Sequence, residues 1–288
     1  MNFKKTSMIR KLAYLLIVST VFAACEKIVE VDLPSEDPRL VIEGQITDQR
    51  EPWQVRLTLS QPYFDQDEAE AISNAVVRIT GTDGSDVLLT HTDTGMFVSA
   101  DTQQCVVGES YTLSVDYQGE NYIASETMKN AFELDTLAGF FLPPDVSFFP
   151  SGIYVFVQGQ TDPTQDNYYI FRTYKNDSLT SEDLDNDEFG SVSLLNSTFD
   201  VNDIAGEVSR GFLPRPILTD VEEGDKVMVE QFAVTLDYFQ YILDLNAQQS
   251  RSGTPFDPPP ANPNNNISNG ALGYFSVANK KEDSIIIE

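Results

Sequence analysis

The residue with the clearest chemical role is Cys25, which follows a short apolar run near the start of the chain. Four basic residues at positions 4–11 precede that run, which covers the thirteen residues 12–24. A helix needs about 20 residues to span a bilayer, so the run predicts a secretion signal over 1–24. Ala23 and Ala24 before Cys25 resemble a bacterial lipobox, in which the cysteine thiol receives a diacylglycerol and becomes the new N-terminus. The alternative is an ordinary signal peptide with an incidental cysteine.

An acidic cluster offers a second kind of chemistry, calcium binding. Asp183, Asp185 and Asp187 match the first three ligand positions of an EF-hand loop, but Glu188 replaces the required glycine and Leu194 the bidentate glutamate. This excludes an EF-hand. An irregular calcium loop and a plain solvated acidic loop both remain open, and the covalent lipid is otherwise the only prosthetic group that we expect.

Catalytic options are restricted by the single histidine, His91. A serine–histidine–acid triad would have to include it, and a metal site built from several histidines is impossible. The sequence contains no nucleophile elbow, P-loop or dinucleotide-binding glycine pattern. We interpret His91 as a surface or strand-edge residue and expect no enzymatic activity. A hydrolase that uses two of the 45 acidic residues is the remaining catalytic alternative.

Composition indicates a folded, strongly acidic protein. The formal net charge is −27, and removal of a leader with four basic and no acidic residues would give −31. Such a charge repels nucleic acid. Hydrophobic residues make up 41% and aromatic residues 11% of the chain, enough for substantial cores. Apart from Cys25, Cys105 is the only cysteine, so we expect no intrachain disulfide and a buried thiol.

Short strand-like runs alternate with turn signals from Arg39 to about residue 130. The run 53–59 alternates between polar and apolar residues, and the runs 111–117 and 122–124 flank a hairpin turn at 118–121. About seven strands at this spacing predict an immunoglobulin-like β-sandwich over 39–130. Residues 25–38, between the cysteine and the first strand, read as a lipidated tether.

The second block, 131–288, predicts further strands and one helix. An apolar residue recurs at helical spacing between residues 235 and 250, which predicts an amphipathic helix there. The fold class is therefore mainly all-β, an immunoglobulin-like sandwich followed by a β-rich domain with one helix. Its expected strands are 153–157, 168–172, 226–234, 271–277 and 284–287.

A proline-rich loop follows the predicted helix and is a candidate partner contact. Pro258, Pro259 and Pro260 restrict the backbone before binding, and Phe256 offers an apolar anchor. The alternative is that this loop folds back over its own domain.

Several segments, in their order along the chain, carry a resemblance to a known family. They cover 25–27, 31–34, 40–48, 74–77, 108–113, 167–169, 255–256, 258–263 and 266–275. Together they resemble the Bacteroidota lipoprotein family called domain of unknown function 4249. One departure is Gln45, at a position where that family often has an aromatic residue.

The resemblance implies an outer-membrane lipoprotein, often encoded beside a TonB-dependent transporter. The acidic residues close behind Cys25 resemble the surface-export signals of such lipoproteins, so we expect a lipid-anchored protein exposed at the cell surface; the alternative is a plain acidic spacer. The resemblance brings no catalytic residues. We therefore expect a non-enzymatic accessory subunit of an outer-membrane β-barrel, a TonB-dependent transporter first of all, bound to the membrane through its lipid. The alternative is a surface protein that captures a glycan or a metal chelate.

Overall fold

A computed structural model describes residues 37–62, 67–131, 134–143, 151–159, 168–179, 193–196, 211–212, 221–249 and 262–288. Backbone contacts separate Met1–Asp37 from Pro38–Glu288, which forms one compact unit. The boundary between them lies at the end of the predicted tether, 25–38.

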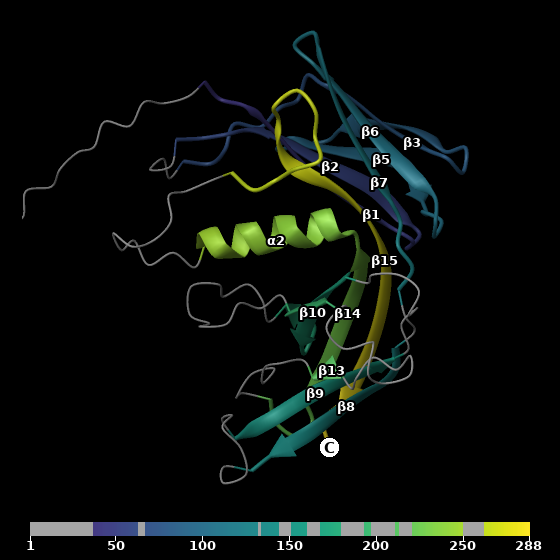
Figure 1. Cartoon of the computed structure of the whole chain (residues 1–288), viewed down its shortest axis with the longest axis vertical. Coiled ribbons are helices and arrows are strands. Elements are labelled where there is room, and N and C mark those ends of the chain that lie inside the picture. The colour runs from purple at the N-terminus through teal and green to yellow at the C-terminus, as the bar shows by residue number, and fades with distance from the viewer. Residues whose placement is uncertain are drawn as a thin grey trace, which may run out of the picture. The chain divides into compact units, whose positions relative to one another are not determined.

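The described part of the chain consists of fifteen strands and one helix (Figure 1). The strands of the N-terminal half are β1 (Leu40–Thr47), β2 (Glu51–Leu59), β3 (Val76–Gly81), β4 (Asp86–His91), β5 (Met96–Gln103), β6 (Ser110–Tyr117) and β7 (Glu120–Thr127). They are followed by β8 (Leu134–Leu142), β9 (Gly152–Gly159), β10 (Tyr168–Lys175), β11 (Ser178–Leu179), β12 (Ser193–Asn196), β13 (Gly211–Phe212), β14 (Lys226–Val234), α2 (Leu236–Gln249) and β15 (Leu272–Ile286).

The N-terminal strands form a sandwich around one hydrophobic core. They pair in the order β1-β2-β5-β4-β3-β6-β7. Alternation decides which side chains enter the core: on β2, Trp53, Val55 and Leu57 are buried while Gln54 and Arg56 are exposed. The confirmed fold class is thus mainly β, a β-sandwich with one helix.

The C-terminal strand β15 belongs to both halves of the described structure, and Figure 1 shows it passing both β1 and β14. Its first part, Leu272 to Ala278, pairs in parallel with β1, and its second part, Asn279 to Ile286, pairs antiparallel with β14. Phe275 therefore joins the first core. The strands that we expected at 271–277 and 284–287 are one strand, and the blocks 39–130 and 131–288 share one continuous sheet.

A second core lies between the β10–β14–β15 part of this sheet and the three-stranded sheet β13-β9-β8. Val227 and Val229 of β14 are fully buried there. Gly139 of β8 faces the side chains of Ile285 and Ile287, and a Cβ at Gly139 would lie 3.1 Å from Ile287. The absence of a side chain at Gly139 therefore lets the smaller sheet approach β15 closely.

Helix α2 starts at a threonine cap, close to the predicted 235–250. The Thr235 hydroxyl accepts a hydrogen bond from the Tyr238 N–H at 3.4 Å, and Asp237 lies in the first turn, where a negative charge is favourable. Phe239 and Ile242 pack against a third apolar cluster formed with β10 and β14. Of the described helices, none is long and apolar enough to cross a membrane.

We expect a large loss of stability when Gly273 of β15 is replaced by alanine. Its φ is +93°, and a Cβ would lie 2.1 Å from the Ile42 carbonyl oxygen, so the β1–β15 pairing would have to shift. Gly273→Ala should reduce the free energy of unfolding by at least about 3 kcal/mol. The control Gly84→Ala also has positive φ, +91°, but meets no atom within 4 Å. It should cost only about 1–2 kcal/mol. Chemical denaturation measures both, and equal costs would contradict this account of the pairing.

Candidate functional site

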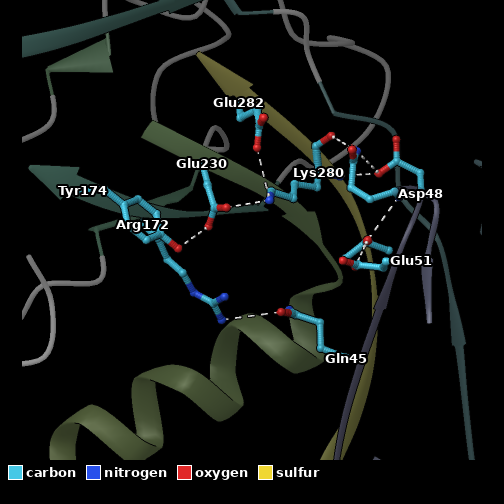
Figure 2. Close-up of polar contacts among 10 residues, drawn as sticks. Gln45, Asp48, Glu51, Arg172, Tyr174, Glu230, Lys280 and Glu282 are labelled. Atoms are coloured by element: carbon cyan, nitrogen blue, oxygen red, sulfur yellow. Dashed lines mark hydrogen bonds and ion pairs between the residues drawn. The ribbon is translucent and has the colours of Figure 1, made fainter. Parts of the chain in front are cut away.

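Polar side chains converge on the sheet face beside α2, although the strands that carry them are far apart in sequence. Arg172 on β10 lies opposite Glu230 on β14, which lies opposite Glu282 on β15. Residues opposite each other in register share a face of the sheet, so three strands bring their charges together. Lys280 and Gln45 complete the group, called here the polar network (Figure 2).

Lys280 is the centre of the polar network. Its Nζ lies 2.5 Å from Glu230 Oε1 and 3.2 Å from Glu282 Oε2, and the Tyr174 hydroxyl donates to Glu230 Oε2 at 2.7 Å. The Glu230 side chain is only 9% exposed, against 58% for Glu282. The contact between Lys280 and Glu230 is therefore the buried one, and burial makes an unpaired charge there expensive.

The protonation states of Lys280 and of the neighbouring Tyr174 are fixed at neutral pH. Burial lowers the pKa of Lys280, but the hydrogen bond and charge of Glu230 outweigh it, so this pKa is raised. Burial and the hydrogen bond to Glu230 also raise the pKa of the Tyr174 hydroxyl. Lys280 therefore stays charged and Tyr174 stays neutral, which suits a fixed hydrogen-bonding surface better than proton transfer.

Arg172 extends the polar network to β1. Its guanidinium lies 4.7 Å from the centre of the Phe232 ring, within cation–π range. Its Nη2 donates to Gln45 Oε1 at 3.5 Å. The arginine thus contacts both an aromatic ring of β14 and a side chain of β1.

A cavity of about 260 Å³ lies next to Gln45 and is also lined by Glu51, Pro52, Trp53 and Gln54. Glu51 Oε1 accepts a hydrogen bond from the Thr47 hydroxyl at 2.9 Å. Two amides and a carboxylate make this a polar hollow, small beside ligand pockets of about 300–1,000 Å³. It fits water or one small polar group. In the described ranges, no group of three His, Cys, Asp or Glu residues could hold a metal ion.

The residues that the sequence singled out for function lie outside the described part of the chain and remain predictions. They are Cys25, the calcium candidates Asp183, Asp185 and Asp187, and the contact candidates Phe256, Pro258, Pro259 and Pro260. His91 does lie within it, exposed at the end of β4 with its ring 5.3 Å from that of Phe97. Trp53 and Cys105 are buried.

Sequence reasoning missed the polar network. The available signal was a charged residue inside an apolar strand: Arg172 closes the run 168–172, and Glu230 interrupts 226–234. That signal marks each residue as unusual. It does not reveal their pairing, because the sequence of one strand does not determine its register with a distant strand.

Comparisons with known proteins give one family and several distant structural likenesses. The family model described as "Domain of unknown function (DUF4249)" matches residues 26–284. No curated protein matches the sequence significantly.

Among solved structures, a two-domain fibronectin type-III segment of chicken tenascin is 10% identical, with 69% of this chain and 91% of that chain covered and a TM-score of 0.19. Escherichia coli alpha-2-macroglobulin activated by porcine elastase is 11% identical, with a TM-score of 0.22. That match covers 88% of this chain and 20% of the alpha-2-macroglobulin chain. Such low TM-scores assign neither a fold nor a function.

Removing the lysine of the polar network should leave a buried carboxylate without its partner. Lys280→Met is expected to lower the free energy of unfolding by about 3–5 kcal/mol. Adding Glu230→Leu should recover most of the loss, since an apolar replacement of a whole buried pair is often neutral. The control Lys226→Met breaks an exposed pair with Asp177, 2.8 Å long, and should cost less than about 1 kcal/mol.

The cost of Lys280→Met should also depend on pH in a defined direction. Because folding raises the pKa of Lys280, its contribution is complete below its ordinary value of 10.5 and is lost as the pH rises through the raised value. Denaturation between about pH 6 and 9 should therefore show a constant difference from wild type, shrinking above about pH 10.5. A difference that grows in alkali would contradict the assigned pairing.

Proposed function

We propose that this protein, which belongs to the DUF4249 family, is an outer-membrane lipoprotein that acts as a non-enzymatic accessory subunit of a β-barrel in that membrane. One observation carries the proposal. The family match begins at residue 26, directly behind Cys25, and the compact unit begins at Pro38. Leader, cysteine, short tether and folded body thus follow one another as in a lipid-anchored protein at the cell surface.

The tether sets how far the body can move from its lipid. Pro38 lies thirteen positions after Cys25, and a chain of that length reaches at most about 45 Å. A body held within that distance meets a neighbouring membrane protein at a high effective concentration. Weak contacts are then sufficient for a stable assembly.

The described side chains favour binding over catalysis. In the polar network the charges of Lys280 and Glu230 neutralise each other, and the proton of Tyr174 is held in place. The formal charge of −31 that remains after removal of the leader favours a partner with basic loops and keeps the body away from anionic lipid. The partner that we propose is a TonB-dependent transporter. Part of the contact with it is formed by Phe256 and Pro258 to Pro260.

Replacing Cys25 tests the anchor. Cys25→Ala should move the protein from the membrane fraction to the soluble fraction or leave it unprocessed, because the alanine cannot carry a thioether-linked lipid. Intact-mass spectrometry of the wild type should show cleavage before residue 25 and an added diacylglycerol. The control Cys105→Ala removes the other cysteine, which is buried, and should leave the protein lipidated. Membrane association unchanged in Cys25→Ala would overturn the anchor.

Affinity purification from gently solubilised membranes tests the partner. The tagged wild type should recover a β-barrel in stoichiometric amount, identified by mass spectrometry. Phe256→Ser combined with serine at Pro258, Pro259 and Pro260 should reduce that recovery at least about fivefold, because an apolar anchor and a restricted backbone are both lost. The control Phe141→Ser removes an aromatic ring that is 59% exposed on β8, outside the loop, and should leave recovery of the barrel unchanged.

Two results would count against this partner. Recovery of the lipoprotein alone, with the fold intact, would contradict docking altogether. Unchanged recovery in the loop variant would place the contact elsewhere on the body.

A further inference from the structure

A cavity lined by described residues lies at one end of the first sandwich. Its volume is about 460 Å³, within the range of small-molecule sites. Four chain segments meet there: the start of β1, the end of β2, the β6–β7 turn and the turn before β15. The lining consists of Pro38, Arg39, Leu40, Leu59, Tyr117, Gln118, Tyr122, Asn269, Gly270 and Ala271.

Hydrogen bonds between these segments hold the cavity walls in place. The Asn269 amide donates to the Asn121 carbonyl at 2.6 Å, which joins the turn before β15 to the start of β7. The Arg39 N–H donates to the Ser60 hydroxyl at 2.9 Å, which joins β1 to β2. Arg39 Nη1 reaches the Gly270 carbonyl at 3.5 Å. A ligand would therefore meet a largely formed site, which lowers the entropy cost of binding.

The lining combines rigid aromatic rings with amide groups. Tyr122 is half-buried and supplies a flat surface, whereas the Tyr117 ring is buried in the core of the sandwich and only its hydroxyl is available to a ligand. The Gln118 amide nitrogen donates to the Tyr117 hydroxyl at 2.9 Å, so the hydroxyl proton of Tyr117 is left to donate elsewhere. The carbonyl oxygens of Gln118 and Asn269 add acceptors. Donors and acceptors around flat apolar surfaces suit a ligand with an apolar ring face and several hydroxyls.

The charge of the cavity lining indicates which charge the ligand should carry. Arg39 is its one charged residue, in a chain of net charge −27. A guanidinium can bind a carboxylate with two parallel hydrogen bonds, which a neutral hydroxyl cannot match. One arginine suits a single carboxylate rather than a run of phosphates, which would need more cations.

We propose that this cavity binds a saccharide that carries a carboxylate, a uronic acid. The carboxylate pairs with the Arg39 guanidinium, the sugar ring lies on Tyr122, and the ring hydroxyls bond the amides of Gln118 and Asn269. This site is separate from the polar network and does not depend on docking to a barrel, so either proposal can fail alone.

Paired sugars test the site on the full chain in detergent. Galacturonic, glucuronic and mannuronic acids are compared by calorimetry with galactose, glucose and mannose, which share their rings and lack the carboxylate. At least one acid should bind about tenfold more tightly than its neutral partner, as expected for a hydrogen bond to a charged group. Arg39→Gln should reduce that ratio to below about twofold, while Tyr122→Ala should weaken the acid and the neutral sugar alike.

The control is Arg78→Gln, which removes an exposed arginine paired with Asp86 on β3 and β4, outside the cavity. It should leave the ratio unchanged, and thermal unfolding should show that every variant is folded. The proposal is overturned if no uronic acid binds at millimolar concentration. It is also overturned if acid and neutral sugar bind equally, or if Arg39→Gln retains the preference.

Discussion

The structure depends on one strand that is shared between two cores. β15 pairs with β1 up to Ala278 and with β14 from Asn279 onward. Where β1 ends, side chains replace it: Asp48 accepts the Lys280 N–H at 2.7 Å, and the Gln49 amide donates to the Lys280 carbonyl at 3.1 Å. The backbone therefore stays satisfied at the crossing, which a buried strand requires. Without these two side chains, the change of partner would expose unpaired amides between the cores.

A buried carboxylate joins the sandwich to the helix and to the same strand. Glu126 of β7 accepts hydrogen bonds from Thr235 at the start of α2, from Asn266 at 3.2 Å, and from the Tyr274 hydroxyl at 3.4 Å. Burial is the main reason that the pKa of Glu126 is raised, and nearby Asp237 raises it further. The raised pKa means that folding becomes less favourable as Glu126 ionises. The three donors offset part of that cost and fix where the helix begins.

Local sequence patterns predicted much of the fold and almost none of the polar network. The helical spacing of Phe239 and Ile242 predicted α2, and alternation along β2 predicted which residues face the core. Both signals lie within a single element. The parallel pairing of Val41 with Leu272 joins residues 231 positions apart and depends on how both cores pack. The polar network was hard to predict for the same reason. Its residues come together only when distant strands pair in the correct register.

The two proposed activities become connected through the position of the cavity in the chain. Pro38 both begins the compact unit and lines the cavity, and it lies thirteen positions after Cys25. In the proposed arrangement, a sugar bound beside Tyr122 lies at the end of the body to which the lipid tether is attached. It would be held within about 45 Å of the anchor. An accessory subunit built this way would keep its ligand close to the barrel at its side, and a short tether would then contribute to ligand delivery as well as to attachment.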